Sequence, residues 1–204
     1  MKNNDRFFLI IFFLLFSFLS FSQNGNPDHF FHKKRFNAGL IAGLNSSSLG
    51  GEGLDDFIGW NAGVIGIANV TKHLHFSLEL LWSQNGGYLK ADFFPDLNYS
   101  KVKMNFIEVP VQFNYQLQQN EELSDRKGWL RAGFSFAHLL NKKIEAENID
   151  VSNQIIWKKE YSFLINFGGT FFLNNNWGID IRMGFPTHSK DLIPTFALRG
   201  IYLL

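Results

Sequence analysis

"NFIEVPVQFNYQL", residues 105–117, decides the fold class of this 204-residue chain. Apolar residues occupy every second position, and a period of two predicts a β-strand with one apolar and one polar face. The apolar face consists of Ile107, Val109, Val111, Phe113, Tyr115 and Leu117. The opposite face contains Glu108 and Pro110. The charge of Glu108 is costly to bury, and Pro110 has no N–H to donate to a neighbouring strand. The rest of the chain has to show which face meets water.

The first 22 residues have the pattern of a secretory signal peptide. Lys2 and Arg6 give a basic start, an apolar run covers 7–19, and "SFS" (20–22) places small residues before a cleavage position at Gln23. The run is shorter than the roughly 20 residues of a membrane-spanning helix. The expected domain order is a signal peptide (1–22), a periplasmic N-terminal lead-in (23–34) and a β-barrel (35–204).

Composition excludes several classes of site and partner. The chain has no cysteine, which excludes disulfides, thiolate metal sites and a lipid anchor through cysteine. Basic and acidic side chains number 19 and 18, so bulk charge gives no indication of a nucleic-acid partner. Aromatic residues make up 17% of the chain and helical periodicity is scarce, which favours an all-β domain.

Alternating segments recur along the chain, separated by residues that favour turns. The eight expected strands are 35–45, 59–70, 75–87, 103–117, 128–140, 161–173, 177–186 and 193–204. No helix is expected between them, so consecutive strands should pair as antiparallel hairpins. The sequence therefore predicts an eight-stranded antiparallel up-and-down β-barrel.

The connections alternate in length. Those at 45–58, 88–102 and 141–160 are long and polar, whereas 71–74 and 174–176 are short. Short turns on one rim and long loops on the other are typical of outer-membrane barrels. The connection at 118–127 is longer than this pattern expects.

Six charged residues within the strands fall on the face opposite the apolar stripe. They are Glu79, Glu108, Arg131, Asp180, Arg182 and Arg199. In a soluble lipocalin-like barrel this face would point outward to water, and in a transmembrane barrel it would point into the lumen. Alternation alone does not separate these two geometries.

Three features favour the transmembrane geometry. The charged set balances three acids against three bases, as a narrow lumen requires. Glycine and small residues are frequent on the same face, where an eight-stranded barrel has little room. Third, aromatic residues with a polar group cluster near strand ends, as they do at lipid interfaces. These expected interface residues are Trp60, Tyr88, Tyr115, Tyr161, Trp177 and Tyr202, whereas parity turns Trp129 inward.

Register predicts two ion pairs. A symmetric turn about 187–192 places Asp180 opposite Arg199 on the polar face, where a cross-strand ion pair is favourable. Glu108 is expected to meet Arg131 of the next strand through the stagger of the barrel. The missing N–H of Pro110 is expected to be accommodated by a bulge or by a group in the lumen.

"FIEVPVQFNYQL" (106–117) resembles the hydrophobic-Glu-hydrophobic-Pro strand that recurs in PorT-like outer-membrane β-barrel proteins, with Glu108 and Pro110 as its motif residues. "HLHFSLELLWSQNGG" (73–87) and "FNAGLIAGLNSS" (36–47) resemble the preceding hairpin and the first strand of that family. The resemblance implies an eight-stranded barrel in the outer membrane with both ends in the periplasm. It also implies a link to type IX protein secretion, for which the namesake of the family is required, although most relatives share only the barrel.

Catalytic and metal sites are weakly indicated. "THSKD" (187–191) contains His188, Ser189 and Asp191, but neighbours in one loop rarely hold a nucleophile and its base in hydrogen-bond geometry. Parity puts Ser135 and His138 on opposite faces. The histidines of "HFFH" (29–32) and "HLH" (73–75) lack the partners of a full metal site, and neither metal nor cofactor is expected.

Three classes of function remain open. The first is a non-enzymatic outer-membrane barrel with a closed polar lumen, contacting outer-membrane lipid and acting through the loops at 45–58, 88–102 and 141–160 as a scaffold or partner of envelope or secretion proteins. The second is a periplasmic or secreted lipocalin-like barrel that binds an apolar ligand. The third is an outer-membrane lipid-modifying enzyme. An open pore is not expected, because eight strands enclose too narrow a lumen.

Overall fold

The structure is a computed structural model that describes residues 36–47, 56–71, 73–90, 99–117, 128–146, 161–187 and 194–204. The predicted signal peptide (1–22) and lead-in (23–34) lie outside these residues, as does the connection at 118–127. Within the described residues, no helix is long and apolar enough to cross a membrane.

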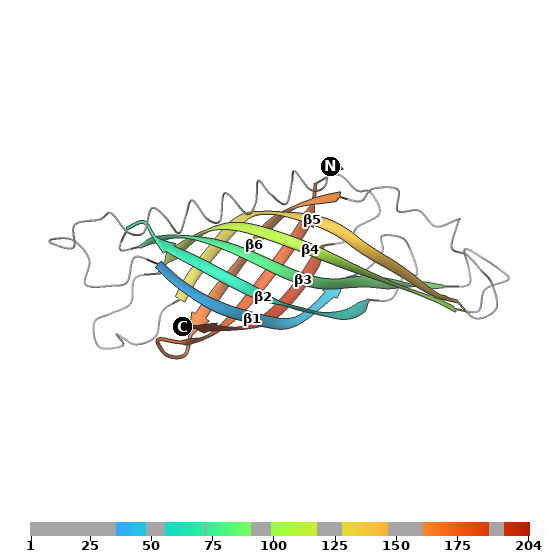
Figure 1. The fold of residues 1–204 in the computed structure, drawn as a ribbon, viewed down its shortest axis with the longest axis horizontal. Helices are drawn as coiled ribbons and strands as arrows, with labels where there is room; N and C mark the ends of the chain where they lie inside the picture. The colour runs from blue at the N-terminus through green and yellow to red at the C-terminus, as the bar shows by residue number, and fades with distance from the viewer. Residues whose placement is uncertain are drawn as a thin grey trace, which may run out of the picture. The chain divides into compact units, whose positions relative to one another are not determined.

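Eight strands form a closed antiparallel barrel in which each strand pairs with the next along the chain and β8 pairs with β1 (Figure 1). They are β1 (Phe36–Ser47), β2 (Phe57–Asn69), β3 (Leu74–Lys90), β4 (Tyr99–Gln116), β5 (Gly128–Ala146), β6 (Tyr161–Phe172), β7 (Trp177–Pro186) and β8 (Thr195–Leu203). The predicted fold class is confirmed. Leu204 N–H donates to the Ala38 carbonyl at 2.9 Å, so the barrel begins and ends at the same rim.

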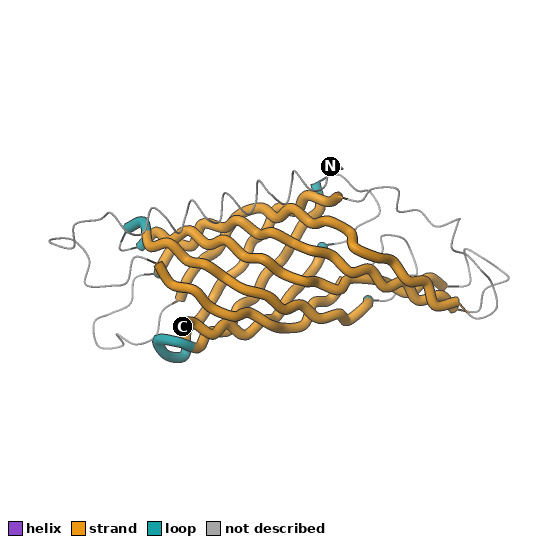
Figure 2. The backbone as a smooth tube through the Cα atoms, viewed as in Figure 1, coloured by secondary structure: helices purple, strands orange, loops and turns teal. Residues whose placement is uncertain are grey.

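We call this the short-turn rim, because the connections around Thr71 and at 173–176 lie there, and the opposite one the long-loop rim. Three strands extend past the others at the long-loop rim (Figure 2). β3 runs to Lys90, β4 starts at Tyr99 and β5 ends at Ala146, so parts of the predicted loops 88–102 and 141–160 are strand.

The strands β3, β4 and β5 continue there because antiparallel pairing needs backbone groups and not apolar side chains. Gly86, Lys103 and Lys143 occupy one cross-strand row of this extension, and none of them belongs to an apolar stripe. The predicted ends of the third and fifth strands (87 and 140) are therefore too early, and the predicted start of the fourth (103) is too late.

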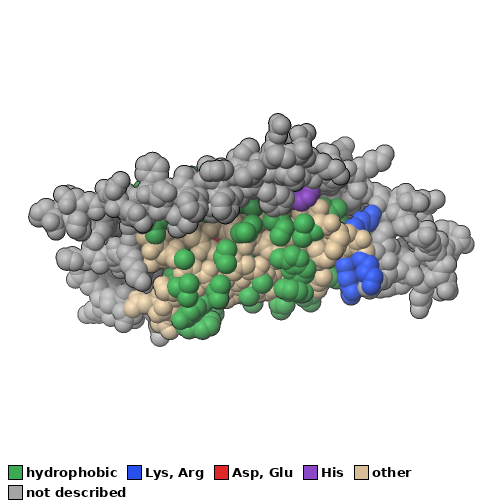
Figure 3. Space-filling view, in the orientation of Figure 1, with side chains coloured by type: hydrophobic (Ala, Val, Ile, Leu, Met, Phe, Trp, Pro, Cys, Tyr) green, Lys and Arg blue, Asp and Glu red, His purple; other side chains and the backbone are tan. Residues whose placement is uncertain are grey.

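The two faces of the barrel wall have opposite chemistry. Along β7 every second residue is buried, and the buried set includes Asp180 and Arg182, whereas Ile179 and Ile181 are exposed on the outside. The same pattern leaves large apolar side chains on the outer surface of most strands (Figure 3). A lipocalin-like barrel needs the charged face outward, so the structure overturns that alternative and matches a barrel whose wall faces lipid.

Pro110 is accommodated without a bulge at its own position. Its ring lies on the buried face, and it is in register with Ser135 of β5. On the other side, the register between β3 and β4 skips Val109 and Pro110. The gap in the ladder falls where proline has no N–H to donate, and the register shift of β4 against β5 lies instead between Asn105 and Phe106.

The apolar outer wall predicts how charged substitutions depend on depth in the membrane. Leu198 is 50% exposed on the outer face at the level of Arg199. We expect Leu198→Arg to lower the free energy of unfolding in lipid vesicles by about 2–4 kcal/mol, because it places a cation near the bilayer midplane. Reversible denaturant titration of the refolded barrel measures this value.

Ile58 at the start of β2 is the matched control, since it is 71% exposed near the long-loop rim. Ile58→Arg should cost about 0–1 kcal/mol. Equal destabilisation by the two arginines would contradict the placement of this wall in lipid.

Candidate functional site

Four charged side chains form a closed ring of ion pairs in the lumen, which we call the ionic ring. Arg131 Nη1 lies 2.6 Å from Asp180 Oδ1, and Arg131 Nη2 lies 2.5 Å from Glu79 Oε1. Arg199 contacts the same two acids, with Nη1 2.9 Å from Glu79 Oε2 and Nε 2.8 Å from Asp180 Oδ2. All four are buried. Each charge is therefore compensated by two opposite charges, which a buried ionic group requires.

Neutral polar side chains complete the hydrogen bonding of the ionic ring. Arg131 donates from Nε to Asn114 Oδ1 at 2.8 Å and from Nη2 to Ser77 Oγ at 3.1 Å. Thr170 donates to Asp180 Oδ1 at 2.7 Å. Sequence reasoning did not select these three polar residues, although each has the inward parity that identified the charged ones.

A second ion pair lies beside the ionic ring. Arg182 Nη1 is 3.0 Å from Glu108 Oε1, and its Nη2 donates to Glu108 Oε2 at 3.2 Å. Arg182 Nη1 is also 3.9 Å from Glu79, which links the pair to the ring. A cavity of about 30 Å³ adjoins Glu108 and Arg182. A space of this size holds one or two water molecules.

The structure places all six predicted charged residues inside the barrel. The predicted register of Asp180 against Arg199 is confirmed, and the two side chains form an ion pair. The expected contact of Glu108 with Arg131 is wrong. Arg131 is opposite Asn114 in the neighbouring strand and reaches across the lumen to β3 and β7, which leaves Glu108 to Arg182.

Each of the three arginines in the lumen has a glycine as a cross-strand neighbour. Gly43 of β1 is in register with Arg199, and Gly168 of β6 is in register with both Arg131 and Arg182. A Cβ atom on Gly43 would lie 2.5 Å from Arg199 Cα and 2.2 Å from the Leu198 carbonyl oxygen. The glycines thus provide the space in which the arginine stems leave the wall.

Apolar side chains occupy the lumen on both sides of the charged residues. Toward the short-turn rim one cluster packs Ile41, Ile201, Leu203 and Phe172 with Trp129, which stacks on His75 at 4.7 Å between ring centroids. Trp129 therefore points inward, as parity predicted. Toward the long-loop rim a second cluster consists of Val102, Met104, Phe106, Ala137 and Leu164. Between the ionic ring and this second cluster lies the cavity beside Glu108 and Arg182, which Phe106, Ala137 and Leu164 also line.

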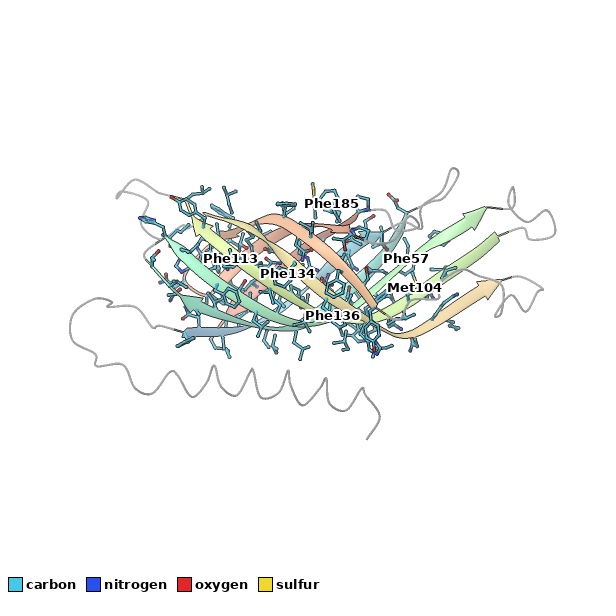
Figure 4. All side chains as sticks on the ribbon, turned by 90° about the horizontal axis from the view of Figure 1, so that it is seen from above. Phe57, Met104, Phe113, Phe134, Phe136 and Phe185 are labelled. Carbon is cyan, nitrogen blue, oxygen red and sulfur yellow. The ribbon has the colours of Figure 1, made fainter. Side chains whose placement is uncertain are left out.

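In Figure 4, Met104 and Phe57 lie toward the extended strands, and Phe113 lies toward the opposite end. Phe113 is exposed on the outer wall, whereas Met104 and Phe57 are buried. The labelled aromatic side chains thus belong to both faces of the wall.

The predicted interface aromatics divide into two groups. Trp60 and Tyr161 are exposed toward the long-loop rim, and Tyr115 and Trp177 toward the other. Trp177 packs against the half-buried Tyr202, with ring centroids 4.8 Å apart.

Tyr88 differs from the other five, because it lies on the extension, with Lys101 Nζ 5.2 Å from its ring centroid. Trp82 takes the expected place at the long-loop rim, where its ring lies 4.1 Å from that of Trp60. Its position within the apolar stripe of the third strand concealed this role in the sequence.

The catalytic candidates are not assembled in the described part of the chain. Ser135 is buried inside, whereas His138 stacks on Tyr161 on the outer wall at 4.8 Å. His188, Ser189 and Asp191 lie outside the described residues. Among the described residues no group of three or more histidines and carboxylates could hold a metal ion.

Comparison with known proteins identifies a family. The model of the outer membrane protein beta-barrel domain matches residues 16–153, more than half of the chain. No curated protein matches. Similar solved structures include Ail, the attachment invasion locus protein of Yersinia pestis (13% identity, TM-score 0.46, 82% of this chain and 98% of that chain).

Two further solved structures have comparable similarity. They are the outer membrane enzyme PagL (11% identity, TM-score 0.45, 82% of this chain and 98% of that chain) and Neisserial surface protein A (13% identity, TM-score 0.44, 83% and 96%).

The ionic ring predicts a non-additive response to substitution. Arg199→Met leaves Glu79 and Asp180 with too little positive charge, so the free energy of unfolding should fall by about 3–5 kcal/mol. Adding Asp180→Asn restores the charge balance. The double variant should therefore be less destabilised than the sum of the single variants by about 0.5–3 kcal/mol, as measured by denaturant titration. Strictly additive losses would show that the two side chains do not interact.

The cross-strand glycines predict a second, steric effect. Gly43→Ala should destabilise the barrel by about 1–3 kcal/mol, because its Cβ overlaps the backbone of β8. Gly200 of β8 is the control, since a Cβ there meets nothing closer than the Ala42 carbonyl oxygen at 3.8 Å. Thermal unfolding of the two alanine variants compares them. Equal losses would exclude a steric role for Gly43.

Proposed function

The chain belongs to the outer-membrane protein β-barrel domain family, and from this premise we propose that it is a non-enzymatic integral barrel that acts through its loops. Its role is to scaffold or recruit other components of the envelope at the long-loop rim. The candidate contact regions are the predicted loops 45–58, 88–102 and 141–160.

The observation that carries this proposal is the pairing of the charged groups in the lumen. The six carboxylate and guanidinium groups there bind one another in the ionic ring and in the Glu108–Arg182 pair, and apolar clusters lie on both sides. Groups whose charges are compensated in this way are suited to hold a structure together and poorly suited to exchange protons with a substrate. The proposal therefore assigns the function to the loops at the long-loop rim and not to the lumen.

A role in type IX protein secretion is the more specific part of the proposal. It is supported by the resemblance of the strand with Glu108 and Pro110 to PorT-like proteins. The same resemblance supports periplasmic termini, and the pattern of residues 1–22 supports export by a signal peptide. An even number of strands with both barrel ends at the short-turn rim is compatible with this orientation.

Deletion of the gene with quantitative mass spectrometry of the medium, the cell surface and the periplasm tests the role in secretion. We expect a set of exported proteins to accumulate in the periplasm and to return to the surface on complementation with the intact chain. A chain in which a Gly-Ser linker replaces residues 91–98, between β3 and β4, should insert normally and fail to complement.

Two controls separate the possible outcomes. Heat-modifiable migration on gels verifies that each variant forms a barrel. The double variant His188→Ala with Ser189→Ala should complement fully, and its failure would contradict a non-enzymatic role. Unchanged export in the deletion strain would exclude a function in secretion.

A further inference from the structure

The ladder between β2 and β3 ends before β3 does. At the long-loop rim the last pair in register is Asn61 with Ser83, whereas β3 continues to Lys90. Alternate residues of an antiparallel strand direct their N–H and carbonyl groups to the same neighbour. Beyond Ser83, the groups of β3 that face β2 therefore need other hydrogen-bond partners, because a buried backbone group without one is costly.

Side chains of β1 supply these partners from the other side of β2. Asn45 donates from Nδ2 to the Gln84 carbonyl oxygen at 2.8 Å. Ser47 Oγ donates to the Gly86 carbonyl oxygen at 3.1 Å and accepts from the Gly86 N–H at 2.9 Å. Asn45 and Ser47 are buried, and β2 separates β1 from β3 in the strand order. Two polar side chains thus bind β3 where the backbone of β2 no longer does.

Two residues of β2 make this contact possible. Gly59 is on the inner face, and a Cβ atom there would lie 1.9 Å from the Gln84 carbonyl oxygen that Asn45 binds. Asn61 donates from Nδ2 to Asn45 Oδ1 at 3.3 Å, which leaves the Nδ2 group of Asn45 directed at β3. The approach of the β1 side chains to β3 therefore depends on glycine at position 59.

Gly86 of β3 also receives the first residue of β2. Phe57 is buried, and a Cβ atom on Gly86 would lie 3.1 Å from Cγ of its ring. Ser47 is the last residue of β1 and Phe57 is the first residue of β2. Both ends of the connection between these strands are therefore held at Gly86, one by two hydrogen bonds and the other by packing.

We propose that Ser47 and Phe57 are positioning residues, which anchor both ends of the connection between β1 and β2 on Gly86 of the extended strand β3. This inference rests on the proposed function, in which the loops at the long-loop rim contact a partner. A loop whose ends are anchored loses less conformational entropy on binding than one whose ends are free. The ionic ring does not include Ser47 or Phe57. Their replacement should therefore change how the connection is presented while the barrel still forms.

Amide hydrogen exchange of the refolded barrel, followed by NMR, tests the anchor. Ser47→Ala removes the acceptor of the Gly86 N–H, so exchange of this amide should become about tenfold faster. Ser47→Thr keeps a hydroxyl and should keep the exchange slow. Ser46→Ala is the matched control, because Ser46 is in register with Phe196 on the outer face and should leave Gly86 unchanged. Unchanged exchange at Gly86 in Ser47→Ala would overturn the anchor.

Complementation of the deletion strain tests what the anchor does. Ser47→Ala and Phe57→Ala should each form a heat-modifiable barrel and restore export only in part, whereas Ser47→Thr should restore it fully. Ile58→Ala is the control for Phe57→Ala, since Ile58 is the next residue and is exposed on the outer wall. It should complement fully, as should Ser46→Ala. Full restoration of export by both Ser47→Ala and Phe57→Ala would overturn the positioning role.

Failure of the proposed function gives a different result. Unchanged export in the deletion strain itself would overturn the role in secretion, and with it the part that Ser47 and Phe57 play in that role. Exchange at Gly86 would still show whether the anchor exists, because it is measured on the barrel alone.

Discussion

The ionic ring in the lumen is the constraint on which the rest of the barrel depends. Glu79, Arg131, Asp180 and Arg199 come from four different strands and are joined only across the interior. Removing any one of them would leave a buried charge without its counterpart, so the strands must keep the stagger that brings all four together. Eight strands enclose a narrow lumen, and within it the glycines in register with the arginines leave room for the guanidinium stems, because a larger residue there would occupy their path.

The sequence was sufficient to predict what lies on each face, and insufficient to predict what meets across the lumen. Parity assigned six charged residues and Trp129 to the interior, since a strand alternates its side chains whatever its neighbours are. The Asp180–Arg199 register followed from one hairpin and its loop. Arg131 was assigned the wrong partner, because contacts across a barrel depend on its shear, which is the sum of all the registers and is not visible in any one of them.

The errors in strand length have a common physical cause. Alternation of apolar and polar residues reports the contact of a strand with lipid, and in β3 the alternation ends at Trp82. The backbone ladder continues for several residues beyond Trp82, through amides, glycine and lysine. The pattern in the sequence therefore measured the thickness of the apolar layer, and the structure shows the strands themselves to be longer. Where the two differ, the strand has left the hydrocarbon and is still paired.

The paired strand segments beyond the apolar stripe are the part of the barrel that can interact with other molecules. Inside the membrane both faces of the barrel wall already make contacts. The inner face carries the ionic ring and the apolar clusters, and the outer face contacts lipid. A substitution there changes stability first, because it disturbs packing or charge balance. On the extension of β3, β4 and β5 the inner face still carries Val102 and Met104 of the second apolar cluster, whereas the outer face lies beyond the apolar stripe and the strands remain paired. A rigid sheet carried beyond the membrane surface can present the same side chains at a fixed height, which a loop of equal length would do only after paying the entropy of ordering. The fold therefore favours binding at this rim. The packed interior of the small barrel holds the extended strands in place.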